Sequence, residues 1–317
     1  MTRRRTVAAT LLALACASQP PPPPLPPCAA GTAGVPLAFE LRAPNGQQAF
    51  LQGSVHFARE REAGLGSRAQ QALAEADVLV GELDMENLTQ EKVAREVFEM
   101  GQLPPGQTLR DVLSPETWNL LEERAQASNM PLEPLLGMKP WVLAMTFIGP
   151  ALGQLGMTRE QGVELQVYAS KRPNATRGLE TIGDQLALFD NMSYPAQDRM
   201  LRDMLEPADP GALDLETMFA AWRCGDAPGL EAVLDGMQSS DPELLPFYEA
   251  TIFQRNASMA KGVQSVVAES QRAFIVVGAL HLVGARGIPA LLEQQGFQVE
   301  QVRAPALPEP TAPPAAP

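Results

Sequence analysis

Positive charge, long apolar runs, cysteine and histidine are all scarce in this chain. Its 317 residues carry 24 Lys and Arg against 37 Asp and Glu, which gives a formal net charge of −13. No basic surface is therefore expected for nucleic-acid phosphates or for anionic lipids. No apolar run is long enough to span a bilayer. With 45% hydrophobic and 19% charged residues, the chain has the composition of a soluble globular protein.

The N-terminus has the layout of an export signal. Three arginines precede a short apolar run and small residues that lead to Cys16. Two forms of processing stay open: cleavage at an Ala-Leu-Ala site that ends at Ala15, or lipoprotein processing that acylates Cys16. We expect a signal peptide over 1–18, a proline-rich linker over 19–35, a folded domain over 36–303 and a disordered proline-rich tail over 304–317. The predicted location is the periplasm or cell envelope, and the only predicted membrane contact is a lipid anchor at Cys16.

Two further cysteines, Cys28 and Cys224, would meet an oxidising compartment after export and could pair. The alternative, which the sequence favours, is two unpaired and partly buried thiols. Their spacing is typical of neither a metal site nor a redox motif.

The order of apolar segments predicts an α/β fold with a central, mostly parallel sheet and a large helical insertion. An Asn45-Gly46 turn joins two expected strands near the start of the domain. At each end of the domain an apolar strand runs into a glycine-containing turn and a helix, and a second strand follows. Most of the intervening residues have a helical pattern, with a helix expected to start at Pro115 and a buried apolar helix expected between Pro140 and Pro150. The carboxyl ends of parallel strands are where such folds carry their ligands.

The chain has only two histidines, and each lies three residues after a glycine at the end of an apolar strand, in "FLQGSVHF" and "FIVVGALHLVG". His56 and His281 are thus placed to emerge at the same edge of the sheet, where a neutral imidazole can bind a metal. For either histidine alone, a hydrogen-bonded core position is the commoner role. The similar setting of the two favours a shared site.

Carboxylates from neighbouring strand ends would complete such a site. Glu82 is the strongest candidate because it ends the apolar strand in "DVLVGELDM", where an unpaired acid would be costly. Asp84 and Glu180 are weaker candidates, since a solvated turn carboxylate explains each equally well. Arg255, in an otherwise apolar helix, could hold a substrate carbonyl or orient an acid. A surface ion pair is the alternative for Arg255.

Seven short motifs in this order resemble the TraB/GumN family, which includes PrgY-type proteins and the Tiki metalloproteases. They are QGSVHF, VLVGELDM, KPWVLA, GVEL, GLETIGDQLALFD, QRNASMAKG and FIVVGALHLVG. The resemblance covers nearly all of Phe39 to Val302 and implies a domain distantly related to the erythromycin-esterase and ChaN-like (EreA/ChaN-like) folds. The family often has aspartate where this chain has Glu164, which weakens any ligand role for that residue.

The resemblance also implies metal-dependent peptidase activity, with Mn²⁺ or Co²⁺ as the metal and Zn²⁺ as an alternative. The proposed active-site groups of the family correspond here to His56, Glu82 and His281. The resulting hypothesis is a hydrolase of peptides or proteins in which these three residues bind one ion that activates water. Glu180 or Asp84 would accept the proton, and Arg255 would stabilise the oxyanion. The alternatives are a cell-envelope protein that binds metal, haem or peptide without catalysis, and a lipoprotein that acts through partner contacts.

Overall fold

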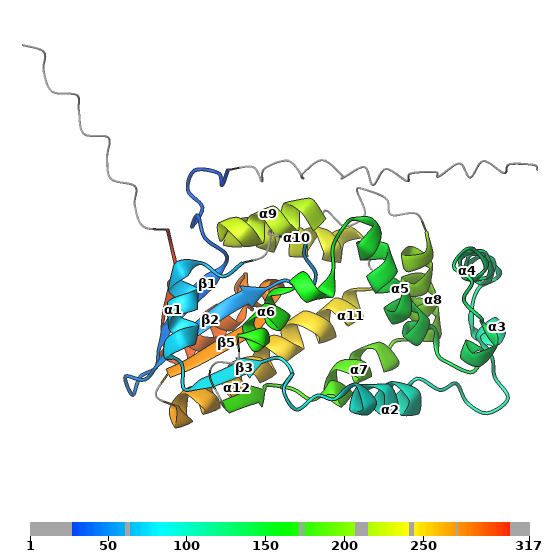
Figure 1. Cartoon of the computed structure of the whole chain (residues 1–317), viewed down its shortest axis with the longest axis horizontal. Coiled ribbons are helices and arrows are strands. Elements are labelled where there is room, and N and C mark those ends of the chain that lie inside the picture. The colour runs from blue at the N-terminus through cyan, green and yellow to red at the C-terminus, as the bar shows by residue number, and fades with distance from the viewer. Residues whose placement is uncertain are drawn as a thin grey trace, which may run out of the picture.

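A six-stranded sheet with helices on both sides forms the body of the molecule (Figure 1). The computed structural model describes residues 27–60, 64–170, 173, 175–206, 215–240, 244–270 and 272–304. The expected signal peptide, Cys16 and nearly all of the C-terminal tail lie outside these residues. The strands are β1 (Ala38–Arg42), β2 (Gln48–Ser54), β3 (Val78–Gly81), β4 (Ala175–Gly178), β5 (Arg272–Gly278) and β6 (Gln298–Gln301), and their order in the sheet is β4-β3-β5-β2-β1-β6.

The four strands β4, β3, β5 and β2 run parallel to one another. All four residues of β3 are buried, as are five of the seven residues of β5, which is the pattern of parallel strands covered on both faces. The rings of Phe50 in β2 and Phe274 in β5 stack at 5.4 Å between centroids. The sheet is therefore mostly parallel, as predicted.

The outer strands β1 and β6 depart from the parallel arrangement. β1 pairs antiparallel with both β2 and β6. The turn at Asn45-Gly46 connects β1 to β2 as expected, and Gly46 has φ of +87°, a conformation that glycine adopts at little cost. The last strand thus joins the sheet at its antiparallel edge.

Helices make up most of the remaining chain. They are α1 (Ser67–Glu75), α2 (Gln90–Met100), α3 (Leu109–Val112), α4 (Pro115–Ala127), α5 (Pro140–Gln154), α6 (Val163–Ala169), α7 (Ile182–Asp190), α8 (Tyr194–Leu205), α9 (Leu215–Cys224), α10 (Ala227–Ser240), α11 (Leu245–Tyr248), α12 (Arg255–Glu269) and α13 (Ile288–Gln294). Short 3₁₀ segments occur at η1 (Glu133–Leu135), η2 (Arg159–Gln161) and η5 (Ala279–Leu282), and a π-helix, η4 (Glu249–Gln254), joins α11 to α12.

Two separate hydrophobic cores hold these elements together. The first lies around the sheet and takes side chains from α1, α6, α9, α10, α12 and α13, with Trp222 fully buried in it. The second is formed by the helical insertion, mainly α3, α4, α5, α7 and α8, with Trp141 fully buried. The insertion lies beyond one end of the strands (Figure 1). Clefts between two such units are common places for ligand sites.

Helices α4 and α5 test two of the sequence expectations. Helix α4 begins at Pro115 as predicted, with the Ser114 hydroxyl accepting a hydrogen bond from the Thr117 N–H. The first turn of α5 is buried, but Met145 is 41% exposed and Pro150 lies inside the helix instead of ending it. The expectation that Pro140 and Pro150 bracket this helix was therefore wrong at its C-terminal end. No helix in the described parts of the chain is long and apolar enough to cross a membrane.

A disulfide joins Cys28 to Cys224, 196 residues apart in sequence. The backbone around it is tied down as well, because the Gly34 N–H donates to the Cys224 carbonyl and the Leu37 N–H to the Trp222 carbonyl. The bond thus fastens the segment before β1 to the end of α9. The expectation of two unpaired thiols was wrong, since the fold brings together two cysteines whose proximity no local pattern reveals.

Candidate functional site

Four of the predicted site residues follow the carboxyl ends of four adjacent parallel strands. Glu180 follows β4, Glu82 follows β3, His281 follows β5 and His56 follows β2. Because these strands are neighbours in this order, their ends deliver the four side chains to one edge of the sheet. The structure thus brings these four predicted residues to the same edge of the sheet.

Arg255, the first residue of α12, lies between the acids from β3 and β4. Its Nη2 donates to Glu82 Oε2 at 2.6 Å and to Glu180 Oε2 at 2.7 Å, and its Nε donates to Glu180 Oε1 at 3.0 Å. Its Nη1 donates to the Thr251 carbonyl at 3.1 Å and lies 3.2 Å from His281 Nε2. A guanidinium has five N–H groups, and these acceptors use all of them. Arg255 therefore has no donor left for a substrate oxygen in this arrangement.

Glu82 has partners besides Arg255. Its Oε1 accepts the Gly278 N–H at 2.7 Å, and its Oε2 accepts the Gln185 side chain at 3.2 Å. A Cβ at Gly278 would stand 3.2 Å from Glu82 Oε1 and 3.4 Å from His281 Cδ2, so the glycine of the second GxxH motif permits this close approach. Gln185 also donates to Glu180. The two acids, the arginine and the glutamine form one buried polar network.

His281 is held in a single orientation. Its Nδ1 lies 2.6 Å from Asn256 Oδ1, while Asn256 Nδ2 donates to the Arg286 carbonyl at 2.8 Å. Because the amide oxygen can only accept, Nδ1 must carry the proton. Nε2 is then a bare acceptor and receives the Arg255 N–H. His281 is only 4% exposed and is thus a neutral, buried imidazole.

His56 lies in a different environment. Its Nδ1 is 2.8 Å from Glu164 Oε1, and the same carboxylate oxygen accepts the Ser54 hydroxyl. The His56 side chain is 63% exposed, and its Nε2 has no partner among the described residues. Helix α6 packs closely on this segment, since a Cβ at Gly162 would stand 2.3 Å from the His56 carbonyl oxygen. The result is a carboxylate–imidazole pair with a reactive nitrogen that faces solvent.

Asp84 does not join either cluster. Its two carboxylate oxygens accept hydrogen bonds from Thr176 and from Asn87, each at 2.7 Å. The turn after β3 therefore uses this carboxylate to fix its own conformation. Nothing in the geometry gives Asp84 a part in proton transfer.

The two histidines have opposite electrostatic environments. The Glu164 carboxylate raises the pKa of His56 to about 9. Burial lowers the pKa of His281 to about 4. Burial alone would raise the pKa of Glu82, but His281, His56, Arg255 and the Gly278 N–H lower it to about 2. At neutral pH the site accordingly holds a charged His56, a neutral His281 and ionised Glu82 and Glu164.

The arrangement does not fit one divalent ion bound by His56, Glu82 and His281 together. Glu82 Oε2 and His281 Nε2 both face the Arg255 guanidinium, so a second cation between them would meet a fixed positive charge. Among the described residues, no group of three or more His, Cys, Asp or Glu side chains could hold a metal ion. The mechanism proposed below therefore uses no metal ion. The Mn²⁺ or Co²⁺ centre stays a prediction from sequence.

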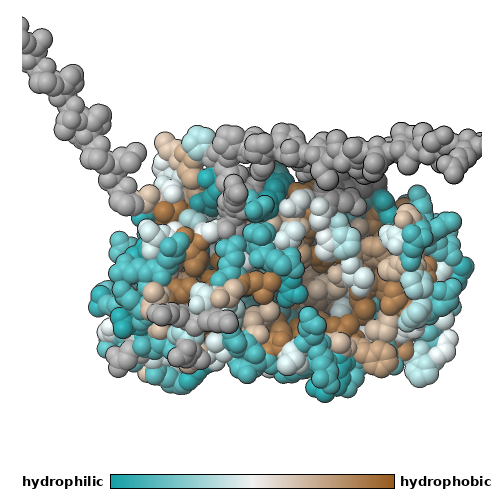
Figure 2. Space-filling model, in the orientation of Figure 1, coloured by the Kyte–Doolittle hydropathy of each residue, from teal (hydrophilic) through white to brown (hydrophobic). Residues whose placement is uncertain are grey.

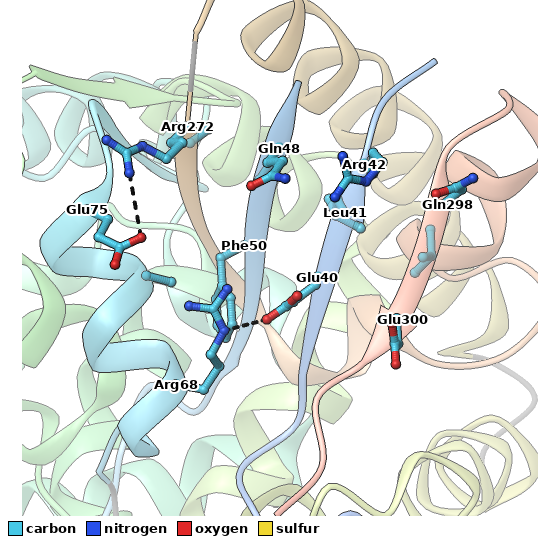
Figure 3. Close-up of a pocket in the computed structure, with 14 residues that line it drawn as sticks. Glu40, Leu41, Arg42, Gln48, Phe50, Arg68, Glu75, Arg272, Gln298 and Glu300 are labelled. Atoms are coloured by element: carbon cyan, nitrogen blue, oxygen red, sulfur yellow. Dashed lines mark hydrogen bonds and ion pairs between the residues drawn. The ribbon is translucent and has the colours of Figure 1, made fainter. Parts of the chain in front are cut away.

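A hollow of about 560 Å³ lies at the opposite ends of the strands (Figure 3). Gln48 and Arg272, the first residues of β2 and β5, line it. Arg272 Nη1 lies 3.6 Å from Glu75 Oε2 of α1, and Arg68 pairs with Glu40. The predicted site residues do not line this hollow, so we place the candidate site at the carboxyl ends of the strands.

Comparison with known proteins identifies the family of this chain. The model of the TraB/PrgY/gumN family matches residues 39–301. The chain belongs to this family. Two of its relatives are the uncharacterized proteins YbaP of Shigella flexneri and of Escherichia coli (strain K12), each 24% identical over 258 residues that cover 80% of this chain and 91% of the relative. No solved structure matches the chain significantly. The family resemblance drawn from short motifs is thus confirmed.

Three contributors to the site were missed in the sequence or given too little weight. Gln185 lies one helical turn after the Thr181 N-cap of α7. Ser54 is the last residue of β2, precedes His56 by two residues and donates its hydroxyl to the same Glu164 carboxylate. Glu164 was a doubtful ligand, yet it is the partner of His56. The sequence signal that could have indicated this role of Glu164 was its position in the first turn of α6, two residues after Gly162.

Replacing Arg255 with methionine should destabilise the fold strongly at neutral pH. Glu82 and Glu180 would become buried carboxylates without a counter-charge, which costs about 3 kcal/mol or more. Urea unfolding at pH 7 measures this change. Arg177→Met is the matched control, because Arg177 pairs with Glu269 on the exposed surface, where such pairs contribute little. Equal stability of the Arg255→Met protein and the native protein would contradict the assignment.

Proposed function

We propose that this protein is a hydrolase of amide bonds, with peptides as its substrates, and that His56 is its general base. The observation that carries the proposal is the His56–Glu164 pair. Glu164 fixes the ring through Nδ1 at 2.8 Å, and the exposed Nε2 has no partner in the described structure. The other predicted groups, Glu82, Glu180 and Asp84, are already engaged by neighbouring donors.

In this mechanism His56 Nε2 takes a proton from a water molecule as the water oxygen attacks the carbonyl carbon of the substrate. The tetrahedral intermediate then breaks the C–N bond, and His56 returns the proton to the leaving nitrogen. Glu164 orients the ring and balances its positive charge while the proton is held. The network of Glu82, Arg255 and His281 lies beside the His56–Glu164 pair. It fixes the carboxyl ends of β3 and β5 and the start of α12.

Hydrolysis should therefore depend on His56 and should increase with pH. His56→Ala is expected to lower kcat/KM by roughly 10²- to 10⁴-fold. In the native protein the rate should rise toward about pH 9, because the pKa of His56 is raised to about 9 and only the neutral ring accepts a proton. Glu164→Gln removes the charge that raises this pKa, so the midpoint should move by more than one unit toward the ordinary value near 6.5. A peptide library read by mass spectrometry supplies the substrate for these profiles.

Dependence of the hydrolysis on a metal ion would be the strongest result against this mechanism. The base mechanism predicts that a chelator leaves kcat/KM unchanged. Loss of activity with chelator, followed by recovery with Mn²⁺, Co²⁺ or Zn²⁺, would overturn it in favour of the metal-bound water expected from the sequence. Peptide binding without any cleavage would instead support the alternative of a non-catalytic binding protein.

We also propose that the protein is exported to the periplasm or cell envelope. The Cys28–Cys224 disulfide supports this, because such bonds persist in oxidising compartments and are rare in the cytosol. The arginines and apolar run at the N-terminus have the layout of a signal peptide. A distant relationship of fold to erythromycin-esterase and ChaN-like proteins belongs to the same proposal, with the mostly parallel sheet as its support.

Mass measurement of the mature protein tests the export proposal. We expect a chain that has lost its first 15 residues and retains the Cys28–Cys224 bond. An added acyl mass at Cys16 identifies a lipid anchor, whereas an unmodified N-terminus identifies a protein released without one. An intact N-terminus together with reduced Cys28 and Cys224 would contradict export.

A further inference from the structure

A row of aromatic rings leads from the second core to the surface of the molecule. The Trp141 and Phe189 rings lie 6.3 Å apart between centroids, Phe189 and Phe247 lie 5.5 Å apart, and Phe247 and Tyr248 lie 6.0 Å apart. Trp141 is fully buried, and Phe189 packs against the second core. Phe247 is only partly buried and belongs to neither hydrophobic core. Part of its ring is therefore left uncovered by the described residues.

Exposed apolar side chains occur on, or directly after, two of the helices that carry this row. Four large hydrophobic residues are notably exposed among the described residues, and three of them lie at α5 and α11: Met145 at 41%, Leu155 at 39% and Leu245 at 43%. Figure 2 shows hydrophobic residues gathered in a recess on the side of the molecule where these helices lie. Apolar side chains that gather in a concave surface, rather than singly, are typical of a binding site.

The row shares two helical segments with the candidate site. Phe189 follows Gln185 by one turn of α7, and Gln185 donates to both Glu82 and Glu180. Phe247 and Arg255 lie on one unbroken helical run that includes the π-helix η4. π-helical turns are rare and occur frequently at functional sites. Each of the two helical segments thus carries a site residue and an aromatic residue, four residues apart in α7 and eight residues apart in the run from α11 to α12.

The carboxylate next to the aromatic row already has partners. Asp190, which follows Phe189 at the end of α7, accepts from Lys139 Nζ at 2.5 Å and from Trp141 Nε1 at 3.2 Å. Asp190 is thus already paired within the described part of the chain, so a charged substrate group beside the row would lose its hydration without gaining this carboxylate as a free partner. The recess therefore selects for apolar groups.

We propose that this recess binds one large apolar side chain of a peptide substrate, such as phenylalanine or leucine, against Phe189 and Phe247. The proposal rests on the proposed function, since it places this side chain beside the bond that His56 would hydrolyse. Stacking and burial against the two rings would supply the selectivity. Phe247 is then a specificity-determining residue.

Four blocked pentapeptides, acetyl-Gly-Gly-X-Gly-Gly-amide with X as Phe, Leu, Ser or Glu, test this preference on the full chain. Ligand-observed NMR gives the affinity of each peptide, and mass spectrometry of the same samples gives cleavage. We expect the Phe and Leu peptides to bind about tenfold more tightly than the Ser and Glu peptides, a ratio within the range for apolar pockets. Equal affinities, or no binding of any peptide, would overturn the proposal.

Variants locate the preference on the molecule. Phe247→Ser should remove the preference for apolar side chains, and Leu245→Ser should weaken it. The fold should tolerate Phe247→Ser, because this ring is partly exposed and lies outside both cores. Phe98→Ser is the matched control, since Phe98 is 59% exposed on α2 and should leave the preference intact. A preference that persists in both Phe247→Ser and Leu245→Ser would overturn the assignment. Preferential binding of the Phe and Leu peptides without cleavage would support this subsite and contradict the proposed hydrolase activity. Cleavage of all four peptides without preference would support the hydrolase activity and contradict the subsite.

Discussion

The ion network of Arg255 with Glu82 and Glu180 is the interaction on which the whole site depends. It joins the carboxyl ends of β3 and β4 to the first turn of α12, and all of its members are nearly buried. A buried charge of this kind is tolerated only with well-placed partners. Each acid has such partners, and the arginine uses every N–H group. The network therefore holds the ends of the strands in register and supplies the fixed charge beside the two histidines.

Around this fixed charge the two histidines take contrasting roles. His281 is buried against Arg255 and Asn256, which keep it neutral with its proton on Nδ1. His56 faces solvent and is paired with Glu164. A neutral, immobilised ring is suited to structure, whereas an exposed ring with a carboxylate behind it is suited to proton transfer. The similar GxxH motifs therefore encode similar backbone positions but different chemistry.

The sequence was sufficient to predict which strand ends bring these side chains to one edge of the sheet. Apolar strands followed by a glycine and a histidine, or by Glu82, indicated the sheet and its functional edge, since these patterns are local. The pairing of side chains was not predictable in the same way. Glu164 is 108 residues from His56 in sequence, and whether Glu82 binds a metal or Arg255 depends on how α12 meets β3. The Cys28–Cys224 bond and the continuation of α5 through Pro150 likewise depend on tertiary packing.

The electrostatic contrast between His56 and His281 can be measured directly, because the chain has only these two histidines. Nitrogen NMR of the untagged protein with ¹⁵N-labelled imidazoles follows both rings through a pH titration. We predict that one ring titrates well above the ordinary pKa of histidine, near 9, and that the other stays neutral in the Nδ1–H form until the pH falls to about 4. Two rings that both titrate near 6.5 would contradict the account. His56 could then not be paired with Glu164, and His281 could not be buried in the network, as described.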